Sequence, residues 1–284
     1  MGSGEADSGE TDAGRRGATI WIPPVPRLAA EVRGQGPLLV FLHGIGGNRS
    51  NWSANIPAFA AAYTTVALDV RGYGDSDDWD GPLHYPDLGH DVARVLDHFG
   101  ADSAHIVGLS MGGRIAMQFA RLHPERVRTL TFVDTHLSFA LLPEDQRRAF
   151  VASRQAPLLA GKSPRDIAPA VVAGLAGPKA TDAMRAQLIE SVAALHKDSY
   201  LKFLHATIEQ DTIGDLDFIT APAHFVVGEF DALTPPELTR RMAGQIRHSQ
   251  VRVSVLPDAG HLSNIENPQA FNQAVRAFLD ESGA

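Results

Sequence analysis

The sequence predicts an α/β fold with a largely parallel sheet, and two patterns support that prediction. Short apolar runs without polar alternation recur along the chain, which is typical of strands that are buried on both faces. These runs are residues 38–42, 65–68, 105–108, 130–133 and 224–227. Segments with apolar residues at helical spacing, such as 88–99 and 113–122, lie between them. Strands that alternate with helices in this way form a doubly wound sheet with helices on both faces.

The N-terminal part differs from this pattern. Residues 1–17 are rich in Gly, Ser, Thr, Asp and Glu. This tail lacks the apolar residues needed to offset the entropy of ordering, so we expect it to be disordered. Residues 19–22 and 28–32 read as short strands, and the proline-rich segment 23–26 separates them. We expect these strands to form a hairpin at the edge of the sheet.

The alternation of strands and helices stops after residue 135. Several helical segments follow one another up to about residue 214, with no convincing strand among them. We therefore expect a helical cap over 136–214, inserted into a core made of 18–135 and 215–284. Ligands bind at the carboxyl ends of the strands in open α/β sheets, so the cap is expected to cover that edge.

Composition narrows the classes of partner. The chain has 284 residues, 25 Lys and Arg against 33 Asp and Glu, and a net charge of −8. That balance disfavours nucleic acid and anionic membranes as partners and favours a small molecule. No apolar run is long enough to span a bilayer, and no signal peptide is evident, so we expect a cytoplasmic protein. The composition leaves open whether the protein forms a homodimer.

The absence of cysteine and the spacing of histidines restrict the chemistry. Without cysteine the chain has no thiol nucleophile, no disulfide and no Cys-ligated zinc. None of its 12 histidines forms the H-E-x-x-H pattern of a helical zinc site. We expect neither a metal nor a cofactor.

A candidate nucleophile lies in the segment Gly108-Leu109-Ser110-Met111-Gly112, which fits the pattern G-x-S-x-G. The segment ends a predicted strand and begins a predicted helix, and this context makes the pattern informative. A sharp strand-to-helix turn crowds the backbone so that glycine is needed on both sides. The turn presents the Ser110 hydroxyl at a helix N-terminus, on the carboxyl edge of the sheet.

A serine nucleophile needs a base, and the base needs a carboxylate to orient it. His261 follows the strand-like segment 251–255, and Asp231 follows the predicted strand that ends at Val227. Asp134 is a competing acid, since it also ends a strand on the same edge. The position relative to His261 favours Asp231.

An acyl-transfer site also needs two donors for the oxyanion. The backbone N–H of Met111, directly after the nucleophile, is one candidate. The second is expected in the glycine-rich loop 43–47 after the first long core strand. There we expect Ile45 to direct its N–H toward the oxyanion.

Taken together, these motifs resemble the α/β-hydrolase family from about Trp21 to Leu279. The segments that carry the resemblance are His43-Gly44, residues 69–76, residues 108–113, residues 228–231 and Gly260-His261. The resemblance implies a mostly parallel eight-stranded sheet with a helical cap, a Ser-His-Asp triad in that chain order, and an acyl-serine intermediate. It says little about the substrate, because members of this family differ most in the cap.

Two subfamilies are similar to different parts of the sequence. Residues 108–113 and 123–127 look most like 3-oxoadipate enol-lactonases and related small-ester hydrolases. Residues 43–48 and the following Asn51-Trp52 are similar to serine hydrolases that cleave C–C bonds in ring-cleavage products. Those enzymes usually carry Asn and Trp where this chain has Leu109 and Leu262, which disfavours C–C cleavage.

The leading hypothesis is a cofactor-free serine hydrolase that cleaves a small carboxylic ester or enol-lactone. The alternatives are a C–C bond hydrolase of a ring-cleavage product and, in another class, a non-catalytic small-molecule receptor of the same fold. We expect Trp52, His136 and Phe139 to contact the substrate. A cation for a substrate carboxylate would come from Arg49, Arg114, Lys197 or a histidine, among which the sequence does not decide.

Overall fold

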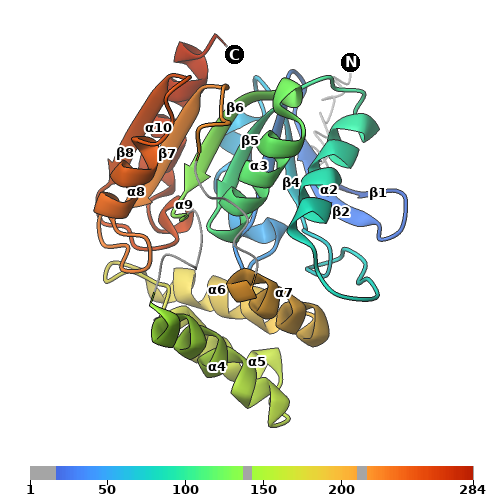
Figure 1. The fold of residues 1–284 in the computed structure, drawn as a ribbon, viewed down its shortest axis with the longest axis vertical. Helices are drawn as coiled ribbons and strands as arrows, with labels where there is room; N and C mark the ends of the chain where they lie inside the picture. Colours follow the sequence, from blue (N-terminus) through green and yellow to red (C-terminus); the bar gives the residue numbers. More distant parts are fainter. Residues whose placement is uncertain (1–16, 137–142, 210–215, 284) are drawn as a thin grey trace, which may run out of the picture.

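The computed structural model describes residues 17–136, 143–209 and 216–283. An eight-stranded sheet runs through its core in the order β1-β2-β4-β3-β5-β6-β7-β8 (Figure 1). The strands are β1 (Ala18–Ile22), β2 (Leu28–Arg33), β3 (Leu38–Leu42), β4 (Thr64–Leu68), β5 (Ala104–Leu109), β6 (Val127–Val133), β7 (Ala223–Gly228) and β8 (Val251–Leu256). Strands β3 to β8 pair in parallel, and β2 pairs antiparallel with β1 and β4. The predicted fold class and edge hairpin are confirmed, while the expected tail lies outside the described residues except for Gly17.

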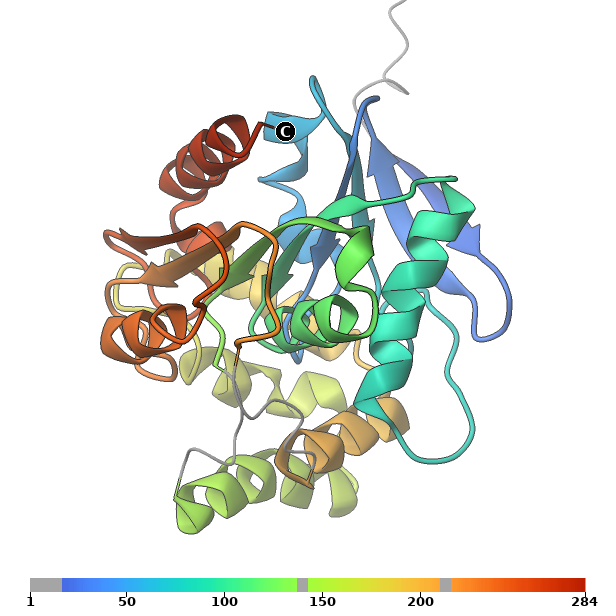
Figure 2. The same ribbon diagram turned by 45° about the horizontal axis from the view of Figure 1, so that its top comes forward.

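Helices cover both faces of the sheet (Figures 1 and 2). One layer contains α2 (Tyr85–His98), α3 (Met111–Leu122) and α8 (Pro236–Ala243). The opposite layer contains η2 (Arg49–Trp52), α1 (Ile56–Phe59) and α10 (Pro268–Glu281), with α9 (Ser263–Glu266) beside them and η3 (Pro124–Arg126) leading into β6. Every residue of β3, β5 and β7 is buried, which explains why their sequences lack polar alternation.

Four consecutive helices lie between β6 and β7 in the sequence and sit together beyond one end of the sheet (Figure 1). They are α4 (Glu144–Leu159), α5 (Pro164–Ala173), α6 (Asp182–Ala193) and α7 (Lys197–Glu209). The side chain of Ser163 caps α5 and that of Thr181 caps α6, and each accepts a backbone N–H that the first helical turn leaves unpaired. We refer to these four helices as the cap.

Polar contacts tie the cap to the loop after β4. The Ser199 hydroxyl of α7 donates to Asp78 Oδ1 at 2.6 Å, and His196 Nδ1 lies 2.9 Å from the same oxygen. His196 Nε2 lies 3.0 Å from the Gly74 carbonyl oxygen. On another side, Asn51 Nδ2 donates to Ser191 Oγ at 3.2 Å. Side-chain hydrogen bonds thus tie the cap to the core in addition to its chain connections.

None of the helices in the described ranges is long and apolar enough to cross a membrane.

A buried ion pair holds α2 to the loop after β4, and its loss should destabilise the fold. Asp91 accepts from Arg71 Nε at 2.6 Å and from Arg71 Nη2 at 2.8 Å, and it is almost fully buried. Asp91→Ala leaves the Arg71 cation without its bidentate partner, so we expect a loss of about 3–5 kcal/mol in the free energy of unfolding. Urea denaturation measures this loss.

The control for this prediction is the Arg165–Glu190 pair, whose side chains are 63% and 65% exposed. Glu190→Ala should change the unfolding midpoint little, because water and salt screen an exposed pair. Equal effects of the two substitutions would contradict the importance that we assign to the buried pair.

Candidate active site

Ser110 stands on a strained turn between β5 and α3. Its backbone has φ 51° and ψ −110°, a region that non-glycine residues rarely adopt. A Cβ atom at Gly108 would lie 2.3 Å from the Gly112 carbonyl oxygen, and one at Gly112 would lie 2.2 Å from the Leu42 carbonyl oxygen. Both positions therefore require glycine. The Ser110 N–H donates to the Val133 carbonyl oxygen at 2.8 Å, which holds the turn against β6.

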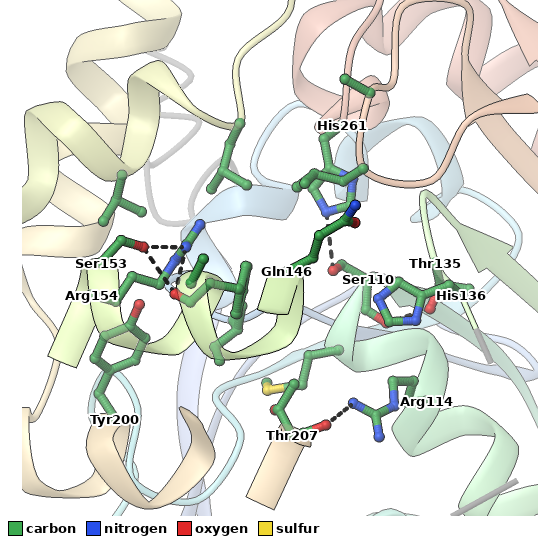
Figure 3. Close-up of a pocket in the computed structure, with 18 residues that line it drawn as sticks. Ser110, Arg114, Thr135, His136, Gln146, Ser153, Arg154, Tyr200, Thr207 and His261 are labelled. Atoms are coloured by element: carbon green, nitrogen blue, oxygen red, sulfur yellow. Dashed lines mark hydrogen bonds between the residues drawn. The ribbon is translucent and has the colours of Figure 1, made fainter. Parts of the chain in front are cut away.

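The structure brings Ser110, His261 and Asp231 into one hydrogen-bonded chain. His261 Nε2 lies 3.1 Å from Ser110 Oγ (Figure 3). His261 Nδ1 lies 3.0 and 3.1 Å from the two oxygens of Asp231. Asp231 also accepts the N–H groups of Leu233 and Thr234, each at 2.9 Å, and the Thr234 hydroxyl. An acceptor saturated in this way is held in one orientation, and it favours the imidazole tautomer with the proton on Nδ1.

Opposing effects set the ionisation of this chain. Burial lowers the pKa of His261, but the Asp231 carboxylate raises it, and the net pKa lies above the ordinary value of a histidine. Burial raises the pKa of Asp231, but His261 and Thr234 lower it, to a net value of about 2. Asp231 is therefore an anion at neutral pH, which stabilises a proton on the imidazole.

Asp134, the competing acid, has different partners. Its carboxylate is fully buried and accepts the N–H of Gly228 and the N–H of Ser263, each at 2.9 Å. Gly228 ends the strand that leads to Asp231, and Ser263 follows closely after His261. Burial and the nearby Asp231 carboxylate raise the pKa of Asp134. Asp134 thus holds the two loops together, whereas the imidazole bonds to Asp231.

The loop after β3 is fixed by a buried histidine. His43 Nδ1 donates to the Gly44 carbonyl oxygen at 2.9 Å, and Nε2 accepts the N–H of Val70 at 3.1 Å. Burial lowers the pKa of His43, which keeps its ring neutral, as these two bonds require. Ile45 from this loop and Met111 both line the same cavity as Ser110. Met111 occupies the first position of α3, where a helix offers no acceptor for the N–H.

A cavity of about 510 Å³ lies between the carboxyl ends of the strands and the cap. Core elements contribute Ser110 and His261 to its wall, and the cap contributes residues from α4, α5 and α7 (Figure 3). The cap residues in the wall are Gln146, Ala149, Phe150, Ser153, Arg154, Val171, Leu175, Tyr200 and Thr207. Its volume suits a compact ligand.

The expected substrate contacts have different outcomes. His136 lines the cavity. Trp52 does not line it, which corrects our expectation: its indole is completely buried in the core, 5.1 Å from the Phe41 ring and 6.0 Å from the Phe271 ring between centroids. Trp52, which follows the glycine-rich loop 43–47, thus packs into the core and not toward the cavity. Phe139 lies outside the described residues.

The side chains that we considered as carboxylate-binding cations have different surroundings in the structure. Arg49 forms an ion pair with the buried Asp69, and Arg114 reaches the cavity wall. Sequence reasoning missed Arg154, which reaches the same wall from α4. No sequence signal singles it out, because α4 also carries Arg147 and Arg148 and its hydrophobic periodicity is weak.

A metal centre finds no support in the described ranges, where no three His, Asp or Glu side chains are grouped as metal ligands.

Comparison with known proteins places the chain in a family. A family model described as the alpha/beta hydrolase fold matches residues 37–268. The chain is 29% identical over 245 residues to 3-oxoadipate enol-lactonase 2 of Acinetobacter baylyi, and the match covers 86% of this chain and 88% of that protein.

Solved structures give the same result. A hydrolase from Pseudomonas aeruginosa superposes with a TM-score of 0.81 at 27% identity, over 92% of this chain and 98% of that one. The enol-lactonase from Burkholderia xenovorans superposes with a TM-score of 0.76 at 25% identity, over 89% of this chain and 96% of that one. With a family match over most of its length and the same sheet, helices and strand-to-helix turn in place, this chain belongs to the α/β-hydrolase fold family.

Proposed function

We propose that the protein is a cofactor-free serine hydrolase that cleaves a small carboxylic ester or enol-lactone through an acyl-serine intermediate. The observation that carries the proposal is the Ser110–His261–Asp231 hydrogen-bonded chain in the wall of a cavity. A nucleophile, a base and an orienting carboxylate are the minimum set for acyl transfer without another catalyst.

In the first half of the reaction, His261 Nε2 accepts the hydroxyl proton while Ser110 Oγ attacks the carbonyl carbon. The carbonyl oxygen becomes an oxyanion, and the N–H groups of Ile45 and Met111 donate to it. The intermediate collapses when the bond to the leaving oxygen breaks and that oxygen takes the proton from the imidazolium. An ester releases its alcohol at this step, whereas a lactone ring opens and its hydroxyl stays attached to the acyl group.

In the second half, His261 removes a proton from water, and the resulting hydroxide attacks the acyl-serine carbonyl. The second oxyanion uses the same donors, and its collapse returns the proton to Ser110 and releases the carboxylic acid. Asp231 stabilises the imidazolium in both halves without exchanging a proton.

Two further observations support the substrate class. The Acinetobacter and Burkholderia proteins described above are named enol-lactonases. The cavity of about 510 Å³ matches pockets that enclose compact small molecules. Both observations favour a compact ester or lactone over a lipid.

Ser110→Ala should abolish nearly all turnover of short-chain p-nitrophenyl esters, by at least about 1,000-fold in kcat, because the triad acts as a unit. Circular dichroism and thermal unfolding of the variant should match those of the parent protein. Substantial activity in a variant preparation free of parent enzyme would contradict the nucleophile assignment. A folded parent protein without turnover of esters, lactones or ring-cleavage dienoates would favour the receptor hypothesis.

Asp231→Asn should reduce kcat by about 10,000-fold, because an amide does not hold the imidazole in the required tautomer. Asp134→Asn is the matched comparison, since Asp134 contacts the same loops but bonds to backbone N–H groups. We expect it to lower stability more than kcat. A greater loss of kcat in Asp134→Asn than in Asp231→Asn would make Asp134 the triad acid.

The profile of kcat/KM against pH should rise along one limb whose midpoint lies above about 6.5, the ordinary pKa of histidine. His261 must be neutral to accept the serine proton, and the Asp231 carboxylate raises its pKa. Loss of activity therefore begins as pH falls through that raised value. A midpoint at or below the ordinary value would contradict this account.

A further inference from the structure

Arg154 places a cation in the cavity wall, and the described residues give it no anionic partner. Its Nη1 donates to the Phe150 carbonyl oxygen at 2.9 Å and to Ser153 Oγ at 3.3 Å. The guanidinium carbon also lies 3.7 Å from the centroid of the Phe150 ring. All of these partners are neutral, and no carboxylate in the described ranges forms an ion pair with Arg154.

Two other partly buried arginines, Arg49 and Arg71, do have carboxylate partners. The guanidinium of Arg49 faces Asp69, and that of Arg71 faces Asp91. The electrostatic neighbour of Arg154 is the hydroxyl of Tyr200, and burial lowers the pKa of Arg154. Removing a cation from water without a counter-charge costs free energy, and an anionic ligand would offset that cost.

The groups around Arg154 are suited to an anion. Tyr200 comes from α7 and is almost fully buried, and burial raises the pKa of its hydroxyl to about 12. The hydroxyl therefore stays protonated and can donate. Ser153 also lies in the cavity wall, but its hydroxyl already donates to the Phe150 carbonyl oxygen at 3.0 Å, so it adds no free donor. The Arg154 guanidinium and the Tyr200 hydroxyl form a donor cluster at the contact between α4 and α7.

This cluster lies across the cavity from the catalytic chain. In Figure 3, Ser153, Arg154 and Tyr200 lie on one side, and Ser110 and His261 lie on the other. Apolar side chains such as Phe150, Val171 and Leu175 also line the cavity. A ligand whose carbonyl carbon reaches Ser110 can therefore extend an apolar chain toward Arg154.

Arg114 also lines the cavity, but it is less suited than Arg154 to bind an anionic ligand. Its guanidinium carbon lies 4.6 Å from the centroid of the Tyr85 ring, and its Nη1 lies 3.5 Å from the Thr207 carbonyl oxygen. The side chain is 2% exposed. Arg114 thus stabilises the junction of α2, α3 and α7, whereas Arg154 is only partly buried and open to a ligand.

We propose that Arg154 and Tyr200 form a carboxylate subsite, and that the natural substrate carries a carboxylate remote from its scissile carbonyl. This inference rests on the proposed function, because Ser110 defines the other end of the substrate. A single planar guanidinium matches the geometry and the single charge of a carboxylate. A second cation would be expected for a dianionic phosphate.

A matched pair of substrates tests the subsite. Mono-p-nitrophenyl adipate ends in a carboxylate, and p-nitrophenyl 6-methylheptanoate replaces the two carboxylate oxygens by methyl groups of similar shape. Arg154→Met should lower kcat/KM for the adipate ester by about 10- to 100-fold, the range for a charged hydrogen bond. It should leave kcat/KM for the neutral ester within about twofold, since the neutral ester makes no charged hydrogen bond with Arg154.

Two variants sharpen the result. Arg148 lies on the same helix, and its side chain is 77% exposed. Arg148→Met should leave kcat/KM unchanged for both substrates. Tyr200→Phe removes one donor and should lower kcat/KM for the adipate ester selectively, by less than Arg154→Met does. Equal losses on both substrates in Arg154→Met, or no loss on either, would overturn the subsite.

A binding measurement separates this inference from the proposed function. Calorimetry should detect monomethyl adipate binding to Ser110→Ala, with binding lost in Ser110→Ala combined with Arg154→Met. If the parent enzyme hydrolyses no ester while this binding difference holds, the proposed function fails and the subsite stands. If both variants bind monomethyl adipate equally, the subsite is wrong whatever the enzyme hydrolyses.

Discussion

The close packing of backbone between β5 and α3 is the constraint on which the candidate site depends. Gly108 and Gly112 let the two elements approach until neither position has room for a Cβ atom, and Ser110 adopts a positive φ between them. That strain persists because hydrogen bonds to Val133 and from Thr135 fix the turn. The same turn aims the hydroxyl at His261 and begins a helix whose first residue, Met111, lines the cavity.

Most of the fold and of the catalytic chain could be predicted from the sequence, because local patterns encode them. Burial on both faces removes polar alternation from β3, β5 and β7, so these strands are visible as apolar runs. Ser110, Asp231 and His261 each follow a strand, and parallel strands bring their carboxyl ends to one edge. Their proximity in space therefore follows from topology, although their catalytic roles await the kinetic tests.

The wall of the cavity could not be predicted in the same way. Trp52 belongs to the core because η2 packs against α10, and nothing in its neighbouring residues signals that long-range contact. Arg154 reaches the cavity because α4 lies against α7, where Tyr200 meets it. In α4 the charged residues do not form one face, so the pattern of the sequence does not show which arginine points inward.

In the proposed function, the core that the sequence predicts carries the chemistry, and the cap residues whose positions it does not predict set the selectivity. In the proposed function, the core supplies a nucleophile, a base and oxyanion donors that act on any accessible carbonyl. The cap supplies much of the shape of the cavity and, within the described residues, a cation without a carboxylate partner, so in the proposed function it decides which carbonyl compounds remain long enough to react. Because the cap is bonded to the core through Asp78 and Asn51, its helices hold Arg154 at a set position relative to Ser110. Under the proposed function and subsite, substrate length is selected by the distance between this cation and Ser110, in addition to the volume of the cavity.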